Sequence, residues 1–419
     1  MSTPQDYVQT LDGRWVRKDS QILGHIQHKP QEESQPYTRD QYLEILSHWL
    51  YLEDLQAVDI VMATALSIYL LGDPVWLFLI APAGSTKTEL LRSFSGEPFY
   101  SISTMTPQTL ISGLKGSKNV DLLPQLNGKV LIIKDFTSIL SKKSEDQSAI
   151  FADLREVHDG YLEKSFGSGV GTKRYHSRFG LIAGVTGVID MYRVIHSLLG
   201  ERFLKCRLLN TAEAAINKAG DLAGKEEEMR RALAQATTSC FTYYAIHARE
   251  QDAANVEERT RERIKALANI TAKLRSEVAR DRWHKVQYQP QAEVGTRLAK
   301  QFLKLAQGLA IFYEHDSVGE KEYEAALRIA QDSVGSQRMQ LVLALVGAGP
   351  ISTKEAGDRA RIPTDTAKEL LEDLWMLKLV DRSGEATFSW QLTKQVNSLL
   401  IEAGLARGYA KHPENTQEQ

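Results

Sequence analysis

The sequence of 419 residues predicts an α/β protein, in which a parallel sheet flanked by helices is followed by a helical lid and a C-terminal winged helix-turn-helix. Between residues 75 and 210, short β-type runs such as VWLFLI, KVLIIKD and FGLIAGVT alternate with helical stretches. This alternation is typical of a parallel sheet with helices on both faces. Charged helical sequence fills 211–335, and the order helix, helix, helix, β-hairpin follows in 336–400.

The remaining segments flank these three parts. Residues 1–36 are polar and aperiodic, so we expect a loose N-terminal arm. In 37–74, apolar residues recur at helical spacing after Thr38, which offers an N-cap, and one or two helices should precede the first strand. Residues 401–419 are expected to form a tail. A chain of this length, with 42% hydrophobic and 25% charged residues, is typical of a globular protein of two or three domains.

Net charge and cysteine content restrict the partners. The formal net charge is -2, so binding to nucleic acid would need a local basic patch or channel. Cys206 and Cys240 are too few for a disulfide framework or a four-ligand zinc site. No signal peptide is evident, and the most apolar stretch, 57–80, is interrupted by Asp59 and by a Gly-Asp-Pro turn. We therefore expect a cytoplasmic protein without a membrane span.

A phosphate-binding loop is the most informative motif. It lies between an apolar strand and a helix, as a Walker A motif requires. Backbone N–H groups would cradle the phosphates of ATP, Lys87 would reach the β- and γ-phosphates, and the Thr88 hydroxyl would coordinate Mg²⁺. Ala81 and Thr86 replace glycines of the motif, and an ordinary strand-turn-helix with a surface lysine is the alternative. The residues expected to contact nucleotide are Ala81, Pro82, Ala83, Gly84, Ser85, Thr86, Lys87, Thr88 and Glu89.

A second buried strand ends in Asp135, the place of a Walker B aspartate that holds magnesium through water. A turn-forming aspartate is the alternative. The next residue is Phe136, where ATPases of this type carry a glutamate that activates water, and a phenylalanine cannot accept a proton. Glu156 or Asp153 could supply a base from the following helix, although a solvated helix face is the alternative. The sequence therefore predicts nucleotide binding and leaves hydrolysis open.

On these residues, the chain resembles an AAA+ ATPase of the branch that includes the MCM replicative helicases, over roughly residues 75–400. The Walker A loop of those helicases also lacks the glycine before its lysine, here replaced by Thr86. The resemblance implies that Thr186 is the sensor-1 residue, which touches the γ-phosphate or the attacking water. It further implies that Arg202 is an arginine finger completing a neighbouring subunit's site, and that Arg297 is the sensor-2 residue of the lid. The alternative for Thr186 is a threonine that is simply buried in a strand. The alternative for Arg202 is a surface salt bridge.

The glycine-rich segment EKSFGSGVGTKRYHSRFG is similar to the pre-sensor-1 hairpin that grips DNA in a central channel. We expect Lys173, Arg174, Tyr175 and His176 near its tip. Basic and aromatic residues interleaved on a hairpin suit a phosphate backbone. A flexible solvated loop is the alternative, because one short basic run is common on protein surfaces.

The winged helix-turn-helix is a second candidate for DNA contact. Its second helix, 364–377, would enter the major groove with Lys368 exposed. However, Glu369, Glu372 and Asp373 make this helix acidic, which disfavours a phosphate backbone. Contact with a protein is the alternative use of this domain.

Three functions are compatible with these features. The first is an ATP-driven homo-oligomeric ring motor, a hexamer, that moves or remodels DNA through Lys87, Asp135, Thr186 and Arg202. The second is an ATP-gated switch or DNA-binding regulator with slow hydrolysis. The third is a helicase loader or protein-remodelling ATPase. Because the large N-terminal domain of the replicative helicases is missing before the P-loop, we expect a diverged relative of the phage or mobile-element type, with a replication or mobile-element protein as partner.

Overall fold

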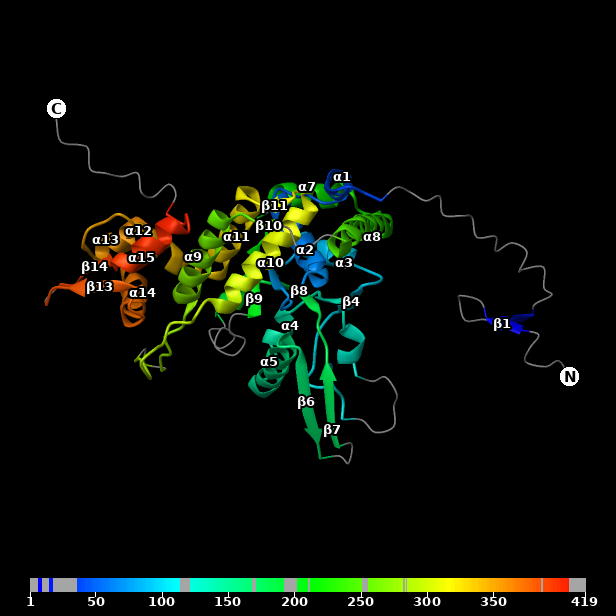
Figure 1. Ribbon diagram of the computed structural model, residues 1–419, viewed down its shortest axis with the longest axis horizontal. Helices are drawn as coiled ribbons and strands as arrows, with labels where there is room; N and C mark the ends of the chain where they lie inside the picture. The colour runs from blue at the N-terminus through cyan, green and yellow to red at the C-terminus, as the bar shows by residue number, and fades with distance from the viewer. Residues whose placement is uncertain are drawn as a thin grey trace. The chain divides into compact units, whose positions relative to one another are not determined.

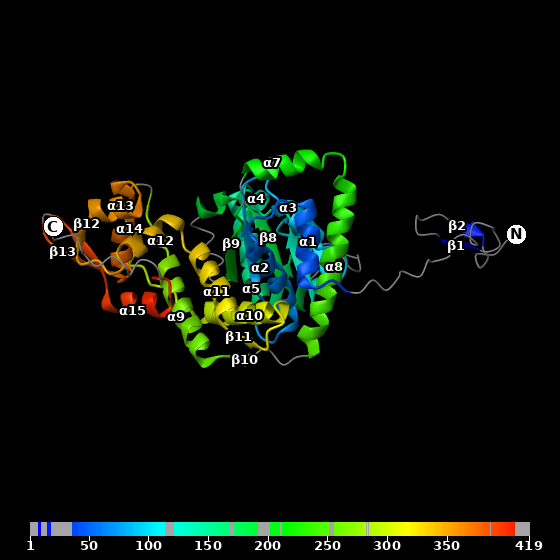
Figure 2. The same ribbon diagram turned by 90° about the horizontal axis from the view of Figure 1, so that it is seen from above.

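The computed structural model describes residues 7–9, 15–17, 36–113, 121–167, 171–191, 202–209, 212–250, 255–281, 283, 285–385 and 387–406. The chain divides into two compact units, Met1–Pro36 and Tyr37–Gln419. In the first unit, β1 (Tyr7–Gln9) pairs antiparallel with β2 (Trp15–Arg17). All the other elements belong to the second unit and are shown in Figures 1 and 2.

A five-stranded, all-parallel sheet forms the centre of the second unit. In spatial order its strands are β4 (Phe99–Ile102), β5 (Val130–Ile133), β8 (Gly180–Val185), β3 (Trp76–Ile80) and β9 (Phe203–Arg207). The predicted α/β class is thus confirmed, and four of the strands coincide with the predicted β-type runs. The fifth, β9, was not predicted as a strand because two of the five residues of its sequence FLKCR, Lys205 and Arg207, are charged.

Helices cover both faces of this sheet. Trp76 and Phe78 of β3 pack into one apolar layer together with α4 and α5, whereas Leu77 and Leu79 pack into the other, with α2 and α10. Alternate side chains of a strand point to opposite faces, so a strand covered on both sides is apolar throughout. The helices of this part are α1 (Arg39–Trp49), α2 (Leu55–Leu66), α3 (Lys87–Ser93), α4 (Thr137–Leu140), α5 (Ser144–His158), α7 (Ala212–Asp221), α8 (Glu226–Glu250), α9 (Glu258–Arg275), α10 (Thr296–Phe312) and α11 (Glu320–Ser333).

Two helices precede the first strand of the sheet, as predicted. Thr38 caps α1, and its N–H donates to Oε1 of Gln41 at 2.9 Å. Asp54 caps α2 and also accepts a hydrogen bond from the Leu209 N–H at 3.0 Å. Arg328 of α11 donates to the same carboxylate, with Nη1 2.6 Å from Oδ1. A buried aspartate therefore ties the helical lid to the start of α2 and to the end of β9.

A β-hairpin projects from the sheet between α5 and β8 (Figure 1). It consists of β6 (Tyr161–Phe166) and β7 (Gly171–His176), whose pairing runs from Phe166↔Gly171 to Tyr161↔His176. The basic and aromatic residues expected near its tip lie instead from the middle of β7 to its base, since Lys173 pairs with Lys164 and His176 with Tyr161. Residues 168–170 lie outside the described residues.

The C-terminal part has the predicted order of three helices and a β-hairpin, with one more helix after them. A three-stranded antiparallel sheet runs in the order β12-β14-β13, and α15 packs on α9. The Tyr323 hydroxyl of α11 donates to the Ala403 carbonyl at 2.7 Å, so this part is joined to the lid. Its elements are α12 (Ser336–Ala344), β12 (Ile351–Ser352), α13 (Thr353–Ala360), α14 (Thr364–Met376), β13 (Val380–Ser383), β14 (Ser389–Leu392) and α15 (Lys394–Glu402). No helix among the described residues is long and apolar enough to cross a membrane.

The backbone of β8 lies against α3 and the end of β5 at Gly184. A Cβ atom placed on Gly184 would lie 2.8 Å from Leu91 Cδ1 and 2.8 Å from the Lys134 carbonyl oxygen. Both distances are shorter than van der Waals contact, and one of the atoms belongs to the backbone. Glycine at this position therefore allows α3 to pack directly on the sheet.

We predict that Gly184→Ala lowers the free energy of unfolding by about 1–3 kcal/mol, because overpacking forces side chains and backbone to shift. Gly187→Ala is the matched control, since a Cβ there would meet nothing within 4 Å. Urea unfolding followed by circular dichroism measures both. Equal midpoints for Gly184→Ala and the wild type would contradict the close packing.

Candidate functional site

Three predicted site residues lie at the same edge of the sheet. Lys87 follows β3 through the loop 81–86, Asp135 follows β5, and Thr186 follows β8. All three strands are parallel, and β8 lies between β3 and β5. Their carboxyl ends therefore form one edge, which is where open parallel sheets bind ligands.

Lys87 is buried at this edge and hydrogen-bonded to the backbone of two strands. Its side-chain Nζ donates to the carbonyl oxygens of Ala81, at 3.1 Å, and Val185, at 2.9 Å. Burial lowers the pKa of Lys87, and the nearby Asp135 carboxylate opposes that shift. An ammonium group has three donors, so the two hydrogen bonds to carbonyls leave one donor for a ligand.

The loop before Lys87 has the features that a phosphate cradle needs. Gly84 adopts a left-handed conformation with φ 76°, and glycine takes this conformation without steric cost. The Ser85 Oγ atom is buried and has no hydrogen-bond partner among the described residues. Leaving a buried hydroxyl unpaired costs free energy, and phosphate oxygens would supply acceptors. The loop residues thus fit the predicted nucleotide.

Phe136, which stands in place of the expected glutamate, is a core residue. Its ring is fully buried and lies 4.8 Å from the Phe78 ring, centroid to centroid. Its backbone N–H donates to the Gly184 carbonyl at 2.7 Å. The side chain at position 136 therefore points into the apolar layer between the sheet and α5. It contributes no polar group to the carboxyl edge.

Thr137 is a site residue that sequence reasoning missed. Its Oγ1 accepts a hydrogen bond from the Thr186 N–H at 3.1 Å and lies 3.4 Å from Thr186 Oγ1. The Thr137 N–H in turn donates to Oδ1 of Asp135 at 3.0 Å. Asp135 is exposed, so its carboxylate is accessible to a cation. The sequence did contain a signal for Thr137. Like Thr186, it is a hydroxyl residue just after a buried strand, two positions beyond Asp135.

Neither candidate for a substitute base lies at the carboxyl edge. Asp153 is buried in α5 and pairs with Lys164 of the hairpin, Nζ to Oδ2 at 2.5 Å. Glu156 is exposed near the end of α5, two residues before His158, whose ring lies 4.9 Å from that of Trp76. Because Trp76 begins β3, this end of α5 lies at the amino edge of the sheet.

Arg202 and Arg297 are brought together, but away from Lys87. Arg202 Nη2 lies 2.8 Å from Asp159 Oδ2, and Arg297 Nη2 lies 3.5 Å from Oδ1 of the same carboxylate. Arg202 immediately precedes β9, whose first residue is in register with Trp76. The two arginines therefore lie at the amino edge, a strand length of roughly 13 Å from the loop 81–86.

A cavity of about 220 Å³ opens beside the loop 81–86. Trp49, which ends α1, and Tyr51 line it together with loop residues and with α7, which lies across the top of the molecule in Figure 2. Glu89 also lines it, although its carboxylate is held by Arg230 of α8 in two hydrogen bonds of 3.1 Å. Sequence reasoning had not connected Trp49, Tyr51 or α7 with the site, because only the tertiary fold places them beside the loop.

The two basic residues of β7 that were predicted to contact nucleic acid differ in how accessible their side chains are. Lys173 Nζ lies 2.7 Å from Asp121 Oδ2 and also donates to the Ser112 carbonyl, so it holds the hairpin to the preceding loop. Arg174 points outward with a side chain 67% exposed and pairs with Glu163 at 3.0 Å. Of these two basic residues, Arg174 is the accessible one.

In the C-terminal part, Lys368 of α14 is exposed, as predicted. The acidic side of this helix faces the protein. Asp373 is 1% exposed and accepts hydrogen bonds from Arg280, with Nε at 3.0 Å and Nη2 at 2.6 Å. Glu369 and Glu372 lie 3.9 Å and 3.7 Å from the same guanidinium. The acidic residues of α14 thus serve an internal contact.

A comparison with models of known protein families found no match to this chain, and neither did a comparison with curated proteins. The structure shows an α/β protein with a five-stranded parallel sheet flanked by helices.

We predict that Phe136→Glu lowers the free energy of unfolding by about 3 kcal/mol or more, because the carboxylate would be buried among aromatic rings. Phe136→Leu, the apolar control, should cost about 1 kcal/mol. Thermal and urea unfolding test both variants. A Phe136→Glu variant as stable as the leucine control would show that position 136 can face the site.

We predict that His158, which is 2% exposed, makes the free energy of unfolding fall at acid pH. Burial, with Arg202 and Arg297 nearby, lowers the pKa of His158 to about 4, whereas the unfolded chain titrates near 6.5. The unfolded state therefore binds more protons below pH 6.5, and the free energy of unfolding should fall by about 3 kcal/mol between pH 6.5 and 4. Urea unfolding against pH measures this loss.

The variant His158→Phe keeps an aromatic ring against Trp76 and has no titratable group. Its unfolding free energy should fall less than that of the wild type over the same pH interval. Parallel curves for the two proteins would contradict the assignment.

Proposed function

We propose that the chain is an ATP-binding protein of the AAA+ P-loop type, with its nucleotide at the carboxyl edge of the sheet. The observation that carries this proposal is the position of Lys87. Its ammonium group lies at the ends of β3 and β8 and retains a donor beyond its two hydrogen bonds to carbonyls. The unpaired hydroxyl of Ser85 in the same loop supports the same ligand.

The proposed roles follow from the side chains at this edge. Loop N–H groups and Lys87 bind the phosphates, and Thr88 with Asp135 would hold Mg²⁺, which neutralises phosphate charge. The hydroxyls of Thr137 and Thr186 would lie beside the terminal phosphate. Aromatic rings can stack on a base, so the cavity beside Trp49 and Tyr51 is the proposed place of adenine.

The position of Arg202 supports assembly into a ring, which we propose to be a hexamer. Within one subunit, Arg202 and Arg297 lie at the opposite edge of the sheet from Lys87 and cannot contact the same phosphates. The Asp159 side chain that they share is 53% exposed, and the side chains of Arg297 and Arg202 are 31% and 11% exposed. In the proposed assembly, this edge faces the nucleotide of the next subunit, where an arginine stabilises the charge of phosphoryl transfer.

The buried ring of Phe136 favours a nucleotide-gated switch with slow hydrolysis. No carboxylate follows Asp135 at the edge, and Asp153 and Glu156 lie elsewhere, so no general base is evident among the described residues. ATP binding would then set the assembly state, and turnover would be slow.

A DNA motor is the second candidate function. The observation that favours it is the β6–β7 hairpin, which projects from the sheet and exposes Arg174 (Figure 1). Basic residues on a projecting hairpin can contact a phosphate backbone. Against it stands Lys173, whose charge is already paired with Asp121.

We predict that Lys87→Met weakens ATP binding at least tenfold, or about 1.4 kcal/mol, measured by calorimetric titration with Mg²⁺·ATP. Lys354→Met is the control, because Lys354 is exposed on α13. Circular dichroism should show that both variants fold. Absence of binding by the wild type, or equal binding by Lys87→Met, would refute the proposed site.

Turnover separates the switch from the motor. Phosphate release is measured with and without single- and double-stranded DNA, for the wild type and for Arg174→Gln. Binding with slow turnover that DNA does not stimulate supports the switch. Stimulation by DNA that Arg174→Gln abolishes supports the motor.

A further inference from the structure

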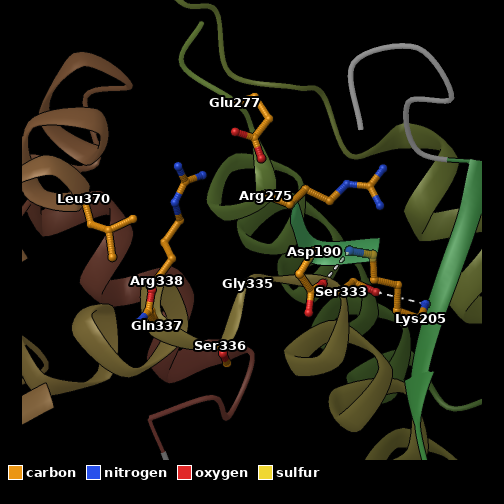
Figure 3. A pocket seen from close by; sticks show the side chains of 10 residues that line it. All are labelled: Asp190, Lys205, Arg275, Glu277, Ser333, Gly335, Ser336, Gln337, Arg338 and Leu370. Carbon is orange, nitrogen blue, oxygen red and sulfur yellow. Dashed lines mark hydrogen bonds and ion pairs between the residues drawn. The ribbon is translucent and has the colours of Figure 1, made fainter. Parts of the chain in front are cut away.

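A polar cavity of about 190 Å³ lies where β9, the end of α9 and the start of α12 meet (Figure 3). Lys205 of β9, Arg275 at the end of α9 and Arg338 of α12 line it, with Asp190 and Glu277 as the acidic members. It shares no lining residue with the cavity beside the P-loop. Three of the lining residues are cations and two are carboxylates, and Glu293 and Asp373 pair with Arg275 and Arg338 from outside the lining.

Arg275 has an unmet hydrogen-bonding capacity. The residue is 8% exposed, and its Nε donates to Glu293 Oε2 at 3.1 Å. Its Nη2 atom is buried and has no hydrogen-bond partner among the described residues. A buried guanidinium donor without an acceptor is costly, more so than a neutral one. A ligand with acceptor oxygens in the cavity would remove that cost.

The start of helix α12 lies at the same cavity. Helix α12 begins at Ser336 after the N-cap Gly335, and its first-turn residues line the cavity. The N–H groups of the first turn have no acceptor within a helix, and the helix dipole favours negative charge at this end. Together with Arg275, this end of α12 forms two independent donor groups around one cavity.

Lys205 adds a second cation beside Arg275. It is 5% exposed, and its Nζ lies 3.4 Å from Asp190 Oδ1. Asp190 is also bound by Arg207, at 2.9 Å and 2.8 Å, so one carboxylate is shared between two cations. Burial lowers the pKa of Lys205 to about 8, against the opposing effect of Asp190. A further anion beside Lys205 would favour its charged form.

Arg338 contributes its charge to the cavity wall, but its donors are used by other partners. Its Nη1 donates to the carbonyl oxygens of Leu274, at 3.0 Å, and Ser276, at 2.6 Å, and its Nη2 lies 3.4 Å from Asp373 Oδ2. These contacts fix its guanidinium at the wall. The side-chain donor left without an acceptor among the described residues is Nη2 of Arg275, and the first turn of α12 adds its backbone N–H groups.

We propose that this cavity binds a phosphate-class oxyanion, held by Arg275, Lys205 and the N-terminus of α12. A guanidinium, an ammonium and backbone N–H groups suit phosphate, because its oxygens can accept hydrogen bonds from several directions. The same chemistry is offered by a free or small-molecule phosphate and by a nucleic-acid backbone. The proposal is independent of nucleotide binding at Lys87.

The test is thermal unfolding of the full chain in sodium phosphate against sodium chloride at equal ionic strength, with calorimetric titration of phosphate. The expected result is a rise in the unfolding midpoint with phosphate, and at least tenfold weaker binding in Arg275→Met. Arg259→Met, an exposed arginine on the same helix, should behave like the wild type. Lys205→Gln is the second variant if Arg275→Met fails to fold.

A short DNA oligonucleotide, titrated in parallel, distinguishes the sources of phosphate. A response to inorganic phosphate assigns the site to a small ligand, and a response to DNA alone assigns it to a nucleic-acid backbone, provided Arg275→Met abolishes it. No response to either probe would overturn the proposal. So would a phosphate response that Lys87→Met removes and Arg275→Met preserves, because the anion would then bind at the P-loop.

Discussion

The hydrogen bonds of Lys87 to the Ala81 and Val185 carbonyls join α3 to the ends of two neighbouring strands. The helix reaches this position only because Gly184 has no side chain where α3 crosses β8. The same register places Thr186 next to Lys87 and, through Thr137, orders the segment after Asp135. One close contact between helix and sheet therefore determines the arrangement of the whole carboxyl edge.

The sheet also separates two groups of charged residues. Lys87 lies at one edge, and Arg202 and Arg297 lie at the other, where both pair with Asp159. The Asp159 side chain is 53% exposed, whereas those of Arg202 and Arg297 are 11% and 31% exposed. In the proposed ring, a phosphate of a neighbouring subunit would compete with Asp159 for both arginines.

The sequence predicted the local features and missed those that depend on tertiary contacts. Strand, loop and helix around Lys87 follow from short-range pattern, and so does the α/β class. The strand β9 was missed because Lys205 and Arg207 interrupt its apolar run, although both find partners in Asp190 only after folding. The role of Phe136 could not be predicted either. Whether a residue after a strand faces a site or a core depends on the rings around it, here those of Phe78 and Phe151.

Tertiary contacts also explain why α14 is acidic. Asp373 is almost fully buried and binds both Arg280 and Arg338, and removing one partner of such a buried pair is strongly destabilising. The acidic residues thus hold α14 against the segment after α9 and do not reflect the demands of a DNA groove. Arg338 also lines the cavity beside Arg275. An anion bound there would act on the residue that anchors α14, so the cavity and the docking of the C-terminal helices are physically connected.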